Sequence, residues 1–120
     1  MGYQAYNLTP SSKIELLRRF PPKFENVRAD HVTYRFGVTS GTPLPYGASV
    51  VVVGYASNEH VECVVVTVDG LQTRPDGKTY HITLSFAQGA SAKMSNDLLD
   101  LGDWKKITPF PVQADPTFNS

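Results

Sequence analysis

The chain has 120 residues, of which 41% are apolar and 18% are charged, and this composition excludes an intrinsically disordered protein. The length fits a single domain over residues 1–120. The 11 basic residues balance the 11 acidic ones, so we expect no extended nucleic-acid groove, because phosphate binding along such a groove needs a basic excess. The sequence shows no signal-peptide pattern, no apolar run of membrane-spanning length and only one cysteine, so we expect a cytoplasmic protein that contacts no membrane.

The first elements are a strand and a helix. Residues 3–8 are expected to form a short strand, and residues 9–12 have the pattern of a helix start. Ile14, Leu17 and Phe20 can share one buried face of that helix. Two consecutive prolines follow and end the helix, because proline cannot donate the backbone hydrogen bond that a further turn needs.

Four later segments are rich in β-branched and aromatic residues and are expected to be strands, namely residues 30–38, 49–55, 60–68 and 79–86. The first and the last alternate polar and apolar residues, which is typical of a half-buried strand. The two between them are continuous β-branched runs, as in the centre of a sheet.

The end of the chain predicts three further segments. Residues 95–101 have the pattern of a short amphipathic helix that a glycine ends. Residues 104–112 can add a last strand at a sheet edge, where prolines are tolerated. Residues 113–120 are expected to form a loose tail.

Two of the half-buried strands carry the same short motif. One reads His-Val-Thr-Tyr over residues 31–34, and the other reads His-Ile-Thr-Leu over residues 81–84. Side chains two positions apart in a strand point to the same face, so each strand presents an imidazole beside a hydroxyl. The same alternation places Val32, Tyr34 and Phe36 opposite His31 and Thr33, and places Ser85 beside His81 and Thr83.

These residue types fit the opening of a cyclic phosphodiester. One group must take a proton from the attacking water and another must protonate the departing oxygen, and histidine can do either near neutral pH. Threonine hydroxyls can hold the non-bridging phosphate oxygens. The alternative interpretation is two half-buried strand histidines that pack beside threonines, which are common in strands.

The paired His-x-Thr-x motifs resemble those of the 2H phosphoesterase superfamily, and the stretch from residue 80 to residue 99 looks most like the cyclic phosphodiesterase domain of fungal tRNA ligases. The resemblance spans most of the chain. It implies a bilobal α+β fold with antiparallel strands lining a central cleft and helices outside. It also implies that His31, Thr33, His81 and Thr83 carry catalysis. The motifs lie closer together here than in the larger members, which puts their substrate-binding insertions in doubt.

Four further residues are candidates for substrate binding. Arg35 shares the face of His31 by alternation and can reach a second phosphate, although a solvent-facing arginine fits the pattern equally well. Lys93, Ser95 and Asn96 lie at a helix start, where backbone N–H groups favour phosphate, although Ser95 also fits a simple helix cap. The three histidines and one cysteine are spread without ligand spacing, so we expect no metal and no cofactor.

Three hypotheses follow for function, in descending order. The first is a metal-independent cyclic phosphodiesterase, acting on a 2′,3′-cyclic phosphate RNA terminus, a cyclic nucleotide or a cyclic oligonucleotide. The second is a binding module that holds a nucleotide or an RNA end in the same cleft without turnover. The third is a structural or interaction domain, for which the histidines would be dispensable. The sequence leaves open which histidine is the acid and which is the base.

Overall fold

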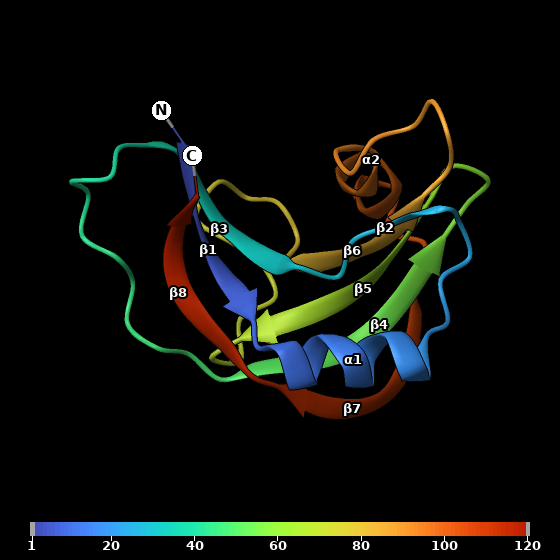
Figure 1. Ribbon diagram of the computed structural model, residues 1–120, viewed down its shortest axis with the longest axis horizontal. Coiled ribbons are helices and arrows are strands. Elements are labelled where there is room, and N and C mark those ends of the chain that lie inside the picture. The colour runs from blue at the N-terminus through green and yellow to red at the C-terminus, as the bar shows by residue number, and fades with distance from the viewer. Residues whose placement is uncertain (1, 120) are drawn as a thin grey trace.

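The computed structural model describes residues 2–119 and shows an α+β fold with two antiparallel sheets and two helices (Figure 1). Met1 and Ser120 lie outside the described residues. The elements are, in chain order, β1 (Gly2–Leu8), α1 (Pro10–Arg19), β2 (Asn26–Val27), β3 (His31–Val38), β4 (Val50–Ser57), β5 (Val61–Val68), β6 (His81–Phe86), α2 (Met94–Asp100), β7 (Lys105–Val112) and β8 (Ala114–Asn119).

The two sheets meet at the strands that carry the paired motif. The smaller sheet has the strand order β3-β1-β8 and the larger one has the order β2-β6-β5-β4-β7. The link just before β3 runs along β6, where the backbone N–H groups of Arg28 and Ala29 donate to the carbonyl oxygens of Leu84 and Thr83 at 2.7 and 2.8 Å. Figure 1 shows β3 and β6 adjoining at this point. Two motifs that are distant in the sequence therefore become neighbours.

The larger sheet is buried on both faces. The side chains of Val64 and Val66 in β5 pack on the face that α1 covers through Leu16. Cys63 and Val65, which alternate with them along the strand, pack on the other face with the leucines of α2. This two-sided burial explains why β5 reads as a continuous β-branched run.

The buried face of α1 differs from the expected one. Leu17 and Phe20 pack against the core as expected, but Ile14 is 69% exposed and the fully buried residue is Leu16. At about 100° per residue, Leu16, Leu17 and Phe20 lie within one arc of the helix and Ile14 lies outside it. The helix begins after Thr9, whose side-chain oxygen accepts a hydrogen bond from the backbone N–H of Ser12 at 3.3 Å.

The expected loose tail is wrong, because residues 114–119 form β8 and pair with residues 3–8 of β1. Without this strand one edge of β1 would expose unpaired backbone groups, and pairing satisfies them. The segment is short and contains a proline, so it lacks the pattern of a central strand. The edge position of β7 is confirmed. Within residues 2–119, neither helix is long and apolar enough to cross a membrane.

Candidate active site

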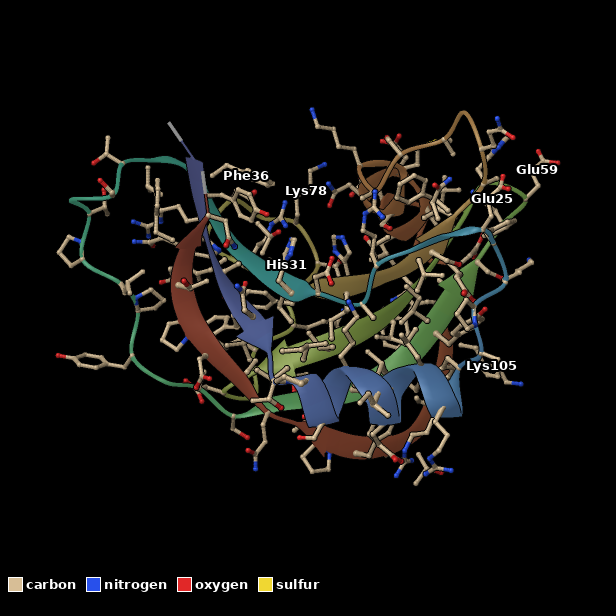
Figure 2. All side chains as sticks on the ribbon, in the orientation of Figure 1. Glu25, His31, Phe36, Glu59, Lys78 and Lys105 are labelled. Carbon is tan, nitrogen blue, oxygen red and sulfur yellow. The ribbon has the colours of Figure 1, made fainter. Side chains whose placement is uncertain are left out.

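A cavity of about 760 Å³ opens where the two sheets meet, beside α2. His31, Thr33, His81 and Thr83 all line it. Figure 2 shows His31 and Phe36 on the side of β3 that faces α2. The structure thus brings both copies of the paired motif to one cavity, although the copies come from different sheets.

The His81 imidazole has a defined orientation. Its Nδ1 lies 2.8 Å from the carbonyl oxygen of Thr79, and a carbonyl oxygen only accepts hydrogen bonds, so Nδ1 carries the hydrogen. Nε2 of the neutral ring is then left with a lone pair. Burial lowers the pKa of His81, because the residue is only 9% exposed. The charges of Arg74 and His31 lower this pKa further, and the hydrogen bond to the Thr79 carbonyl raises it in part.

The second imidazole, His31, is half-buried and packs against an aromatic ring. Its centroid lies 5.3 Å from that of Tyr3, with the two planes tilted by 47°. Burial lowers the pKa of His31, and the neighbouring Asp30 carboxylate raises it in part. Asp30 also lines the cavity and pairs with Lys13 at 2.7 Å. His31 therefore has a nearby carboxylate that favours its protonated form.

The Thr83 hydroxyl is hydrogen-bonded to a side chain of α2. Its Oγ1 lies 2.9 Å from Oγ of Ser95, which is fully buried. The Cys63 thiol also neighbours Ser95, and burial raises the pKa of this thiol to about 12, so it stays protonated. Ser95 is thus a support for Thr83. It does not line the cavity as the sequence-based hypothesis required, and it does not cap α2, which begins one residue before it.

A β-bulge in β3 redirects the residues after the first motif. Thr33 pairs with Ala5 and Arg35 pairs with Gln4, so Tyr34 is an extra residue. A bulge reverses the alternation beyond it, which takes Arg35 away from the cavity and turns Phe36 into the lining. The expected position of Arg35 on the face of His31, and of Phe36 opposite it, is therefore wrong.

A second bulge has the same effect in β6. Thr83 pairs with Cys63 and Ser85 pairs with Glu62, which leaves Leu84 as the extra residue. Ser85 consequently points to the α1 side of the sheet, where its hydroxyl donates to the buried Glu62 carboxylate at 2.7 Å. The expectation that Ser85 lies beside His81 and Thr83 is wrong for this reason. Each motif thus ends at a bulge directly after its threonine.

Lys93 and Asn96 lie in the cavity lining, as the sequence-based hypothesis placed them. Lys93 is exposed at the start of α2. The side-chain oxygen Oδ1 of Asn96 is buried and has no hydrogen-bond partner within residues 2–119. A buried polar atom without a partner is uncommon, so Asn96 has unused capacity for a ligand.

Several lining residues escaped the sequence analysis. Arg28 and Arg74 add two cations, and Tyr3 and Phe118 add two aromatic rings. Tyr3 and Phe118 belong to β1 and β8, so only the pairing of those strands brings them to the cavity. The sole sequence signal for Arg74 was the turn pattern Pro-Asp-Gly that follows it.

Among residues 2–119, no three His, Cys, Asp or Glu side chains gather as metal ligands would. Comparisons with protein-family models, with curated proteins and with solved structures find no match for this chain.

Proposed function

We propose that this chain is a metal-independent phosphodiesterase that opens a 2′,3′-cyclic phosphate RNA end or a related cyclic nucleotide or oligonucleotide. The observation that carries the proposal is that both His-x-Thr motifs line one cavity from strands of different sheets. In this proposal the two sheets are the lobes of a 2H phosphoesterase-like fold, and the cavity between them is its catalytic cleft.

The protonation of the two imidazoles supports a division of labour. Neutral His81, with its Nδ1 hydrogen held by Thr79, can accept the proton of an attacking water at Nε2. The water oxygen then bonds to phosphorus, and the bond from phosphorus to the ribose 2′ or 3′ oxygen breaks. His31 in its protonated form gives its proton to the departing oxygen; burial lowers the pKa of His31, and the Asp30 carboxylate offsets part of that shift. Proton exchange with solvent returns both rings to their starting states, and no step in this scheme uses a metal or a cofactor.

The threonines and the cavity cations support the handling of a phosphate. Hydroxyls of Thr33 and Thr83 can donate to the two non-bridging oxygens, and their positions beside the imidazoles keep the phosphate within reach of both. Lys93 and Asn96 can bind outlying oxygens of the same ligand. The cavity is within the range of small-molecule sites, roughly 300–1,000 Å³, so it admits a nucleotide or a short RNA end.

The test is turnover of a panel of substrates by chelator-treated protein. The panel comprises 2′,3′-cyclic mononucleotides, a short RNA with a cyclic phosphate end, and cyclic di- and trinucleotides. Wild type is compared with His31→Ala, His81→Ala and, as the matched control, His60→Ala, since His60 lies outside the cavity and is half-exposed.

We expect turnover by wild type and by His60→Ala, with a loss of about 100-fold or more in the other two variants. Full activity in a folded His31→Ala or His81→Ala protein would contradict the acid–base assignment. Tight nucleotide binding without turnover by wild type would instead identify the chain as a binding module.

A further inference from the structure

Arg74 is a buried arginine in the wall of the cavity. Its side chain is only 3% exposed, although it lies in the loop between β5 and β6, where side chains are ordinarily solvated. Its guanidinium carbon lies 5.4 Å from the centroid of the Phe36 ring. A guanidinium is charged at any pH that a protein tolerates, so this burial needs a compensating anion, and the Asp76 carboxylate supplies one.

The backbone around Arg74 is fixed by a tight turn. The backbone N–H of Arg74 donates to the carbonyl oxygen of Lys78, and that of Gly77 donates to the carbonyl oxygen of Arg74, both at 2.9 Å. Gly77 has a φ of 90°, a conformation that favours glycine. The side chain is fixed as well, because Nε donates to Oδ1 of Asp76 at 2.8 Å. Arg74 therefore reaches the cavity in a defined conformation.

The internal pairing of Arg74 leaves most of its hydrogen-bonding capacity unused. A guanidinium has five N–H donors, and the bond to Asp76 uses the one at Nε. The four donors at the terminal nitrogens have no acceptor among residues 2–119, and the residue lines the cavity. Because these donors carry the positive charge of the guanidinium at the cavity wall, they can bind an anionic ligand in the cavity.

The anion must bind close to the imidazoles. Arg74 and His81 line the same cavity, and the Arg74 charge lowers the pKa of His81. The planar fork of a guanidinium matches the two non-bridging oxygens of a phosphodiester. We propose that Arg74 binds the phosphate at which His31 and His81 act, through the N–H groups of its terminal nitrogens. The identity of the ligand as substrate phosphate rests on the proposed function, whereas the anion site itself does not.

The first test is binding of inorganic phosphate and of adenosine 3′-phosphate to the full chain, measured by calorimetry. The variants are Arg74→Gln, which loses the charge, and Arg74→Lys, which keeps the charge and loses the fork. Arg18→Gln is the matched control, because Arg18 is exposed on α1 and pairs with Glu15 away from the cavity. Thermal melting of each variant establishes that it is folded.

We expect Arg74→Gln to weaken binding of both ligands by about 10- to 100-fold, which is the loss of one or two charged hydrogen bonds. Arg74→Lys should show a smaller loss and Arg18→Gln should bind as wild type does. Wild-type affinity in either folded Arg74 variant, or no binding of either ligand by wild type, would overturn the proposal.

A second measurement does not depend on the folding of a variant. In wild type, saturation with phosphate should move the guanidinium N–H signals of Arg74 in the NMR spectrum and leave those of Arg18 in place. Unmoved Arg74 signals would overturn the proposal. The turnover panel distinguishes this proposal from the proposed function. Phosphate binding that depends on Arg74, without turnover of any substrate, would refute the phosphodiesterase and retain the anion site. Turnover that does not depend on Arg74 would refute the role of Arg74 and retain the phosphodiesterase.

Discussion

Replacement of Ser95 by alanine tests whether α2 positions the Thr83 hydroxyl, to which the proposed function gives a role in catalysis. Ser95 is fully buried and its Oγ lies 2.9 Å from Oγ1 of Thr83, so the substitution removes one interior hydrogen bond. Such a bond contributes about 1 kcal/mol to the free energy of unfolding. If the Thr83 hydroxyl then loses its hold on the phosphate, the rate should fall by about fivefold to tenfold, which corresponds to roughly 1 kcal/mol or slightly more of transition-state stabilisation.

A double-mutant cycle distinguishes positioning from a general loss of stability. Thr83→Val keeps the shape of the side chain and removes its hydroxyl, so Ser95 has nothing left to position. We expect Ser95→Ala to lower kcat in the wild-type background and to have no further effect on kcat in the Thr83→Val background. Chemical denaturation of the four proteins should show coupling too, because loss of both partners of a hydrogen bond costs less than the two single losses together.

The assay is turnover of the best substrate of the panel at saturating concentration, with each protein shown to be folded. An equal loss of kcat on Ser95→Ala in both backgrounds would refute the reasoning, because it would mean that Ser95 acts by a route other than Thr83. Unchanged kcat in the wild-type background would refute it as well.

Four further predictions concern pH and folding. Burial lowers the pKa of both His31 and His81 below the ordinary value of about 6.5. The active form carries one proton on the two imidazoles together and is most populated below that pH, so the bell-shaped pH profile of kcat/KM should peak there. A peak above pH 7.5 would contradict the assignment. Because the unfolded chain binds these protons more readily than the native one, the melting temperature should fall as pH drops from 7 to 5. Gly54→Ala should lower the free energy of unfolding by about 1–3 kcal/mol in urea titrations, because a Cβ there would overlap the indole of Trp104. Removal of residues 113–120 should lower both the melting temperature and the turnover, since β8 pairs with β1 and supplies part of the cavity wall.

The sequence supported its predictions where a local pattern has a single structural meaning. The continuous β-branched run of β5 indicated a central strand, and β5 lies in the middle of the larger sheet. The prolines of β7 indicated an edge strand, and β7 is an edge. The repeated His-x-Thr motif placed an imidazole and a hydroxyl on one face of each strand, and both pairs line the cavity.

The pattern failed wherever a strand departs from strict alternation. Strict alternation places Arg35 on the face of His31, but the extra residue at Tyr34 reverses the faces beyond it. It also places Ser85 on the face of His81, whereas the extra residue at Leu84 turns Ser85 to the other side of the sheet. A bulge arises from the register between two strands, and a pattern read along one strand contains no information about that register.

The side chains that can transfer protons and hold a phosphate are evident from the sequence, because two imidazoles and two hydroxyls at a fixed spacing are a local property of the chain. Their surroundings depend on the fold. The contact between β3 and β6 made one cavity from two motifs, and the pairing of β8 with β1 turned an apparent tail into part of its wall. The folding of the turn after β5 buried Arg74 in that cavity. These are consequences of strand pairing between distant segments, where satisfaction of backbone hydrogen bonds and burial of both faces of the sheet select the arrangement.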